Sequence, residues 1–567
     1  MNMTNQDSMI IEQFAQAGYQ IDPDALSILI ENNSTQGFIN TILDSLDESI
    51  LVVGPEHIRH GLLVPSKIPS SGSPDISSSI TSKVPLSASP EISSSITSKV
   101  PLSASPEISS PITSKRPFSV SPEISLSVTP QAPLSECYRA PVRDPDFEDE
   151  WTWDLDVLSD ITDQSTCVGE IGEFVDYFRD RFTKLSEMLR NRNVSFRPIE
   201  SLSRRTTGLV EGREEVSLIG MVSNIQTSKN GHRMIEIEDT TGTFRTMVLK
   251  KNKDLFDQAM KVMLDEVVGI TGTLSDDGNL LFINNIMWPD IPTRNSIELG
   301  KPGSTGLAVL ISDIHVGSDT FLEHEWLAFL DWLNGNNNNK NNGSINVSDI
   351  KYLVVAGDVV DGIGVYPDQE KELSILDVYD QYRKAAEYFN QVPEHIKVII
   401  SPGNHDVVRQ AEPQPALPDK VKKMFRPDVI FVGNPAVVSM DGVNTLIYHG
   451  RSIDDLIAAL PGMKYEEPAK PMIEMLKCRH LSPIYGSKVS IAPERTDHLV
   501  INKIPVILHC GHVHTVGCTN YRGVLVVNSG TWQSQTGFQR RMNLQPDPAR
   551  AAVVDLGSLD TKIISFQ

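Results

Sequence analysis

The stretch KYLVVAGDVVD, residues 351–361, decides the fold. Its first half holds an uninterrupted apolar run, YLVVA, which is typical of a strand buried on both faces of a sheet. Its second half is polar and begins where that strand would end. Further runs of this kind recur from Gly306 onward, and the sequence between them shows helical patterns at 323–334, 370–390 and 453–460. The sequence therefore predicts an α/β domain over residues 300–567.

Polar motifs follow four other apolar runs in the same way. Ligands of open α/β sheets gather outside the carboxyl ends of the strands, so we expect the motifs to converge. Any one of them has an ordinary explanation, such as a capping aspartate beside a histidine or a Gly-Asn turn, but their shared position favours a functional site. With Gly357-Asp358-Val359-Val360-Asp361, the set comprises Asp313-Ile314-His315, Gly403-Asn404-His405-Asp406, His449-Gly450 and Gly511-His512-Val513-His514.

The donor atoms in these motifs are imidazole nitrogens, carboxylate oxygens and one amide oxygen, without a thiolate. Mixed nitrogen and oxygen donors suit Mn²⁺, Fe²⁺ or Zn²⁺. They are too many for one tetrahedral zinc ion. They suffice for two ions about 3.5–4 Å apart, an arrangement that stabilises the attacking and leaving oxygens in phosphoryl displacement. Asp358 stands at the centre of the set and is the expected bridge between the ions.

The set resembles the pattern D-x-H, G-D-x-x-D, G-N-H-D, H, G-H-x-H of the calcineurin-like metallophosphoesterases, over about residues 305–530. The resemblance implies a β-sandwich flanked by helices and two divalent metal ions, Mn²⁺ first, with Fe²⁺ or Zn²⁺ as alternatives. It also implies that His405 donates a proton to the leaving oxygen or stabilises the transition state. The implied ligands of one ion are Asp313, His315, Asp358 and His514, and those of the other are Asp358, Asn404, His449 and His512.

Residues 211–295 alternate apolar and polar positions with period 2, as in MIEIED at 234–239. Five short candidate strands, with turns at Thr241-Gly242 and Asp277-Gly278, favour a small closed barrel of the OB type. A generic β-domain is the alternative. A helical connector is expected over residues 166–210.

The N-terminal part of the chain carries two further patterns. Residues 1–50 have helical spacing and predict a small helical interaction domain. Residues 51–165 hold Ser/Pro-rich repeats with a period of 16 and an acidic stretch around Trp151 and Trp153. The repeats have almost no large apolar side chains, so we expect a disordered linker. The acidic stretch is either a docking site for a basic partner or a solvated loop.

Charge and cysteine usage limit the class of protein. Lys and Arg total 50 and Asp and Glu total 73, which gives a formal net charge of −23. This charge argues against a free-standing nucleic-acid binder, but not against a nuclease whose basic partner holds the DNA. Five scattered cysteines are too few for a disulfide framework, and the lack of a CxxC pair argues against a cysteine-based zinc site. The N-terminus lacks a signal-peptide pattern and no apolar stretch could span a bilayer, so we expect a cytoplasmic protein with no membrane partner.

Three segments narrow the substrate further: RHLSPIYG (479–486), IAPERTDHLVI (491–501) and the C-terminal stretch 527–556. Together with the barrel they resemble the small subunits of archaeal family D DNA polymerases (DNA polymerase II), from about residue 200 to the end. This resemblance implies a heterodimer that replicates DNA, in which this chain proofreads 3′ ends by 3′→5′ exonuclease activity for a large catalytic subunit. The 16-residue repeats depart from that family. Two alternatives stay open, a non-catalytic polymerase scaffold and a phosphoprotein phosphatase of the same fold.

Overall fold

The structure is a computed structural model that describes residues 153–203, 215–293, 306–336 and 345–567, with a few isolated positions near the N-terminus. Among those positions, strands β1 (Gln20–Ile21) and β2 (Val52–Val53) pair in parallel. The helical domain expected over 1–50 and the Ser/Pro repeats otherwise lie outside the described residues. The chain divides into two compact units, Met1–Ser135 and Glu136–Gln567, and the second contains the α/β domain and the barrel. Within the described ranges, no helix is long and apolar enough to cross a membrane.

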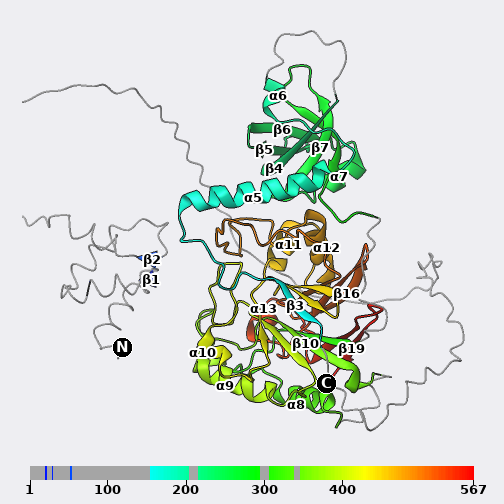
Figure 1. Ribbon diagram of the computed structural model, residues 1–567. Helices are drawn as coiled ribbons and strands as arrows, with labels where there is room; N and C mark the ends of the chain where they lie inside the picture. Colours follow the sequence, from blue (N-terminus) through cyan, green and yellow to red (C-terminus); the bar gives the residue numbers. More distant parts are fainter. Residues whose placement is uncertain are drawn as a thin grey trace, which may run out of the picture. The chain divides into compact units, whose positions relative to one another are not determined.

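Two six-stranded sheets form the centre of the α/β domain (Figure 1). The first contains, in spatial order, β12 (Ile430–Phe431), β11 (Lys397–Ser401), β10 (Ile350–Ala356), β9 (Leu307–Ile311), β18 (Arg550–Asp555) and β19 (Thr561–Ser565). The second contains β16 (Val516–Tyr521), β17 (Val524–Ser529), β15 (Ile507–Cys510), β14 (Val443–Ile447), β13 (Ala436–Met440) and β3 (Leu155–Ser159). Strands β9 to β12 run parallel, whereas the second sheet mixes parallel and antiparallel pairs.

The two sheets share one apolar core, because alternate residues of a strand point to opposite faces. In β10, Tyr352 and Val354 belong to the core between the sheets, whereas Leu353 faces the helices. In β17, Val527 points into the same shared core and Val526 points away from it. The strands are therefore buried on both faces, as their unbroken apolar runs predict.

Helices cover the outer face of each sheet (Figure 1). Helices α8 (Glu323–Leu333) and α9 (Val378–Phe389) pack on the first sheet, and α11 (Ile453–Ala459) and α12 (Ala469–Cys478) pack on the second. Further short helices are α6 (Glu200–Ser203), η1 (Val347–Asp349), η2 (Gln369–Glu372), α10 (Asp419–Lys422) and α13 (Gly537–Arg541). The order of layers is helices, sheet, sheet, helices.

Two of the three expected helices are confirmed by α8 and α11. The third is expected over 370–390, but α9 begins only at Val378. Asp377 caps it, since the Asp377 side chain accepts a hydrogen bond from the main-chain N–H of Asp380 at 3.0 Å. The residues before this cap form the separate turn η2 and a loop.

The acidic linker ends earlier than the sequence predicts. It is expected to extend to residue 165, but β3 lies inside this range and pairs antiparallel with β13. Trp153 is also anchored, because its Nε1–H donates to the main-chain carbonyl of His395 at 3.0 Å. The ammonium group of Lys397 lies 4.6 Å from the centroid of the same ring. Residues from Trp153 onward therefore belong to the α/β domain.

The expected barrel is confirmed as a closed sheet of five strands. In spatial order these are β4 (Glu215–Thr227), β5 (Arg233–Asp239), β6 (Gly242–Val248), β8 (Leu281–Met287) and β7 (Val267–Leu274). Helix α7 (Lys253–Ala259) follows β6 and packs on the barrel core through Leu255. Alternating residues such as Ile235 and Ile237 fill that core, which is the period-2 pattern read from MIEIED.

Helix α5 (Ile171–Arg190) is the helix expected in the connector, and a buried arginine anchors it. Arg181 is fully buried, and its Nε–H donates to Asp497 Oδ2 at 2.8 Å. Its Nη1 donates to the main-chain carbonyls of Pro483 at 2.8 Å and Asp265 at 3.4 Å. Nε2 of His480 lies 2.8 Å from the same Asp497 oxygen. One buried ion pair thus joins α5, the barrel and the C-terminal half.

Replacing Arg181 by alanine is expected to lower the free energy of unfolding by about 3–5 kcal/mol, because the Asp497 carboxylate would stay buried without its partner. Arg179→Ala is the matched control on the same helix. Among the described residues Arg179 pairs only with the exposed Asp176, at 3.8 Å, so its loss should change stability by less than about 0.5 kcal/mol. Urea unfolding of both variants measures the difference. Equal stabilities would show that the buried pair contributes nothing.

Candidate functional site

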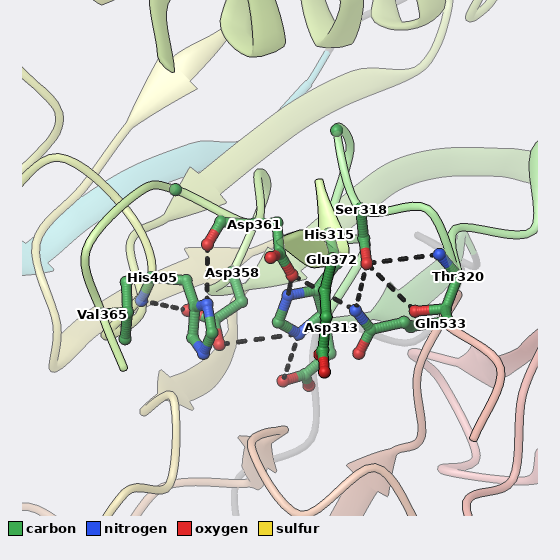
Figure 2. A network of polar contacts seen from close by, with 12 residues as sticks. Asp313, His315, Ser318, Thr320, Asp358, Asp361, Val365, Glu372, His405 and Gln533 are labelled. Carbon is green, nitrogen blue, oxygen red and sulfur yellow. Dashed lines mark hydrogen bonds and ion pairs between the residues drawn. The ribbon is translucent and has the colours of Figure 1, made fainter. Parts of the chain in front are cut away.

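The five motifs meet where β9, β10, β11, β14 and β15 end, and Figure 2 shows residues of the first three, including Asp313, Asp358 and His405. The main-chain N–H of Asp313 donates to the carbonyl of Gly357 at 3.0 Å, which joins the first motif to the second. The main-chain N–H of His405 donates to Asp358 Oδ1 at 2.8 Å, which joins the second to the third. The main-chain N–H of His512 donates to both carboxylate oxygens of Asp313, at 3.1 and 2.9 Å. The motifs thus lie together, as their positions after the strands predict.

Five of the site residues share an unusual backbone conformation. Asp313, His315, Asp358, His512 and His514 all have positive φ, between 52° and 71°. Non-glycine residues seldom adopt such angles, and those that do cluster at functional sites. The surrounding contacts therefore hold these side chains in positions that a relaxed chain would not choose.

Two motif glycines are required by close approach. A Cβ atom on Gly403 would lie 2.2 Å from Asp358 Oδ1, and one on Gly511 would lie 2.3 Å from Asp313 Oδ2. Any side chain at either position would displace a carboxylate of the site. The lack of a side chain at Gly403 and Gly511 therefore leaves the room that the two carboxylates occupy.

One cluster comprises Asp313, His315 and His514, whose donor atoms lie within 4.8 Å of one another. His315 Nε2 lies 3.1 Å from His514 Nε2 and 3.9 Å from Asp313 Oδ1. The second ring nitrogen of His315 lies 2.9 Å from Asp361 Oδ1 (Figure 2). This outer carboxylate fixes which nitrogen of His315 faces the cluster.

A second cluster comprises Asp313, Asp358 and His449. His449 Nε2 lies 3.2 Å from Asp358 Oδ2 and 3.0 Å from Asn404 Oδ1. Its Nδ1 lies 2.9 Å from the main-chain carbonyl of Ala356, so the Nδ1–H is the donor there. Nε2 is then the nitrogen that faces the two side-chain oxygens.

The donor set fits divalent cations. His315 and His449 each use Nδ1–H on an oxygen outside the cluster, at 2.9 Å in both cases, so their Nε2 atoms face inward. There Nε2 meets carboxylate and amide oxygens, which can only accept hydrogen bonds. The facing lone pairs repel one another unless a proton or a metal cation lies between them. Histidine ligands fixed by outer hydrogen bonds are usual in metal sites.

His512 is the expected ligand that lies apart from these clusters. Its Nε2 is 3.6 Å from Asp454 Oδ2, and its ring centroid is 5.2 Å from that of His449. Its main-chain N–H, rather than its ring, contacts Asp313. Among the described residues, the structure brings together six of the seven predicted ligands and leaves the imidazole of His512 at the edge of the set.

His405 stands beside both carboxylate and imidazole groups. Its Nδ1 lies 2.8 Å from the main-chain carbonyl of Asp361, and its ring centroid is 4.8 Å from that of His315 (Figure 2). It is half-buried, whereas His315 and His449 are buried. His315, Asp358 and His405 also form a third cluster that could hold an ion, so geometry alone allows His405 to be a ligand.

Mutual charges set the protonation of the cluster. Burial alone would raise the pKa of Asp358, but the neighbouring imidazoles, led by His449, hold it well below its usual range. Burial would lower the pKa of His449, but the Asp358 carboxylate outweighs it and raises that pKa to about 10. Burial and then the Asp358 charge raise the pKa of Asp406 to about 6. Against the effect of burial, neighbouring imidazoles also lower the pKa values of Asp313 and Asp361, so Asp358 is one of three carboxylates of this site that stay ionised.

The sequence analysis assigned no role to three positioning residues. Asp361 accepts from His315, Asp406 accepts from the main-chain N–H of Gly403 at 2.9 Å, and Gln533 Nε2 donates to Asp361 at 3.2 Å. The sequence did indicate the two aspartates, since each is the last residue of one of the quoted motifs. Gln533 lies in the C-terminal stretch TWQSQ, where nothing in the sequence marks a contact with the site.

Two family models match the chain. The family of DNA polymerase alpha/epsilon B-type subunits matches residues 308–517, which include all five motifs. The family described as OB-fold nucleic acid binding domain matches residues 216–285, which span most of the barrel.

Three curated relatives that match over most of the chain are each named DNA polymerase II small subunit. The one from Archaeoglobus fulgidus is 47% identical over 399 residues, 70% of this chain and 78% of that protein. The one from Methanothermobacter thermautotrophicus is 41% identical over 430 residues, 76% of this chain and 86% of that protein. The one from Halobacterium salinarum is 40% identical over 415 residues, 73% and 78% respectively.

A solved structure of an archaeal phosphodiesterase covers 46% of this chain and 98% of its own, at 13% identity and a TM-score of 0.24. A similarity this weak carries no argument.

Proposed function

The chain belongs to the family of archaeal DNA polymerase II small subunits, and from this premise we propose that it is the 3′→5′ exonuclease of a two-subunit replicative polymerase. Residues 300–567 would be a calcineurin-like metallophosphoesterase domain. The reaction is hydrolysis of the terminal phosphodiester at the 3′ end of a DNA strand, which releases a 5′-nucleotide. One observation carries the proposal: carboxylate, imidazole and amide donors suited to two divalent ions converge at one strand-end site.

Two divalent ions, Mn²⁺ first with Fe²⁺ or Zn²⁺ as alternatives, would be held by the residues of the two clusters. When bound, such a pair stabilises the attacking and leaving oxygens of a phosphodiester. The side chains of this site are already arranged for two ions. Asp358 Oδ2 reaches both clusters, at 3.8 Å from His315 Nε2 and 3.2 Å from His449 Nε2. The hydrogen bonds from Nδ1 of these histidines keep both rings oriented toward that oxygen.

In this proposal His405 transfers the proton. A main-chain carbonyl can only accept, so the contact at 2.8 Å with the carbonyl of Asp361 makes Nδ1–H the donor. Nε2 is then the atom available to a substrate. In the protonated ring, Nε2–H would be donated to the departing 3′ oxygen. The partial exposure of His405 supports a role toward substrate rather than in the buried ligand shell.

The partner in this proposal is the large catalytic subunit. A chain of net charge −23 has little capacity to hold a duplex by itself, because affinity for phosphate comes from counterions released by Lys and Arg. The large subunit would supply most of the DNA-binding surface. The barrel would serve mainly as the surface that contacts it.

The assembled pair is expected to shorten a mismatched primer faster than a matched one, and faster than the isolated chain does, because the site accepts an unpaired end. Digestion of both 5′-labelled primers at fixed salt with Mn²⁺, with and without the large subunit, measures this. A scaffold would shorten neither primer, and a phosphatase of this fold would hydrolyse a phosphopeptide instead. Equal rates on both primers, with and without the large subunit, would refute the division of labour but not the hydrolysis.

A further inference from the structure

We propose that helix α13 and the neighbouring loop 362–376 bind the unpaired 3′-terminal nucleotides of the DNA strand, with Phe538 against a base and Arg540 and Arg541 on phosphates. The inference rests on the function proposed above and names the residues that select a single strand. None of them belongs to the metal or proton-transfer groups of the site.

Helix α13 is fastened to the site by its own residues. Thr536 and Gln539 form a capping box, in which Gln539 Oε1 accepts from the N–H of Thr536 at 3.1 Å and Thr536 Oγ1 accepts from the N–H of Gln539 at 3.2 Å. Nε2 of the same glutamine lies 2.9 Å from Nδ1 of His514, a candidate ligand. Phe538 and Arg540, the neighbours of Gln539, therefore lie at the edge of the site. We call this edge, formed by α13 and the loop 362–376, the rim.

Both segments that border the site carry exposed apolar side chains. Phe538 and Met542 of the α13 region are 56% and 57% exposed, and Ile363 and Leu376 of the loop are 52% and 58% exposed. These are four of the thirteen exposed large apolar residues among those that the structure describes. Single exposed apolar residues are ordinary, but a group of them beside a buried polar site indicates a ligand surface.

The loop and the helix are adjacent, although far apart in the sequence. A Cβ atom on Gly537 would lie 3.3 Å from Oε1 of Glu372 in the loop. Ser318 joins the two segments as well, since it forms a β-bridge with Leu373 and its Oγ accepts from Gln533 Nε2 at 2.8 Å. The loop also approaches the proton-transfer group, because the Tyr366 ring centroid is 6.3 Å from that of His405. One surface thus borders the site from both segments.

The positive charge of this rim lies on helix α13, whereas the loop carries Asp368, Glu370 and Glu372 against Lys371. Arg540 and Arg541 are exposed, and neither forms an ion pair with a carboxylate in the part of the chain that the structure describes. Guanidinium groups bind phosphate through paired N–H donors. An aromatic ring next to cationic side chains is the combination with which single-stranded nucleic acids are bound, the ring on a base and the cations on the backbone.

The exposed apolar side chains explain why the bound DNA strand should be unpaired. In a duplex each base is stacked between its neighbours, so its face is closed to a side chain. A frayed or mismatched end exposes the terminal base, and Phe538 can then stack on it. The rim would thereby favour the ends that proofreading must remove.

The first test replaces Phe538 by alanine and by tryptophan in the full chain. Substrates are a single-stranded oligonucleotide and bis(4-nitrophenyl) phosphate, a diester too small to reach the rim. Phe538→Ala should lower kcat/KM on the oligonucleotide roughly 5- to 100-fold and leave the small diester unchanged. Phe538→Trp should retain activity on both. Ile563→Ala, which removes a 39% exposed side chain on β19, is the control and should change neither.

The second test concerns the arginines. Changing Arg540 and Arg541 to glutamine should make the slope of log K for oligonucleotide binding against log salt concentration shallower by about 1.4, because two phosphate contacts are lost. Phe538→Ala should weaken binding without changing that slope. Arg179→Ala, on the exposed face of α5, is the matched control and should alter neither affinity nor slope.

The outcomes separate the two levels of the proposal. If the wild-type chain hydrolyses neither substrate, the proposed function fails. If it hydrolyses both and Phe538→Ala equals it on both, only the rim assignment fails. Loss of both activities in Phe538→Ala would show damage to the site itself and would also overturn the assignment. So would unchanged oligonucleotide kinetics combined with weakened binding of the large subunit, since the surface would then be a protein contact.

Discussion

Asparagine in place of Asp358 should abolish phosphodiester hydrolysis and reduce the amount of bound metal. One oxygen of this carboxylate lies 3.2 Å from His449 Nε2 and 3.8 Å from His315 Nε2, so it reaches both clusters. Asparagine keeps the shape of the side chain but removes the charge that would bind both cations. Activity on a single-stranded oligonucleotide and metal content by mass spectrometry are measured on the same preparation.

The matched control is Asp319→Asn. Asp319 is an exposed carboxylate near the site, whose main-chain N–H donates to the carbonyl of Glu372 at 3.0 Å. Its replacement removes the same charge without touching the clusters, so activity and metal content should match those of the wild type. Full activity in metal-replete Asp358→Asn would overturn the assignment of the bridge.

Glutamine in place of His405 should slow hydrolysis by about 10²–10⁴-fold, the usual contribution of a general acid, while both ions stay bound. The glutamine amide can donate to the carbonyl of Asp361 as Nδ1–H does, but it cannot give up a proton at neutral pH. Rate and metal content must be measured together, because His405 also lies in a cluster that could hold an ion. If the metal content falls by half, His405 is a ligand and its proposed role is wrong.

The sequence predicted those parts of the fold that short-range patterns encode. Buried parallel strands appear as apolar runs and the barrel strands appear as alternation, so these strands were found, whereas β16, β18 and β19 were not named. Strand β3 was missed because LDVLS lies in an acidic stretch and its partner, β13, is remote in the chain. Helix α12 was missed because Pro468 and Pro471 stand at its start, where proline also marks a turn.

The same division holds for the site. The motifs identified which residues converge, since each follows a strand. They did not identify the carboxylate of Asp361, the contact of Gln533 or the direction of the His512 ring, because these depend on side-chain orientation across segments distant in the sequence. The positive φ angles are likewise a property of the folded chain. A sequence motif therefore locates a site of this kind but does not describe its outer hydrogen bonds.

The most direct measurement of the exonuclease assignment uses a 5′-labelled primer with a mismatched 3′ end. Wild-type chain and Asp358→Asn, each assembled with the large subunit, are incubated with it in Mn²⁺ without nucleotides. We expect the wild-type assembly to shorten the primer one nucleotide at a time from the 3′ end, and the Asp358→Asn assembly to leave it intact. Equal shortening by the two assemblies would contradict the claim that this chain carries the exonuclease.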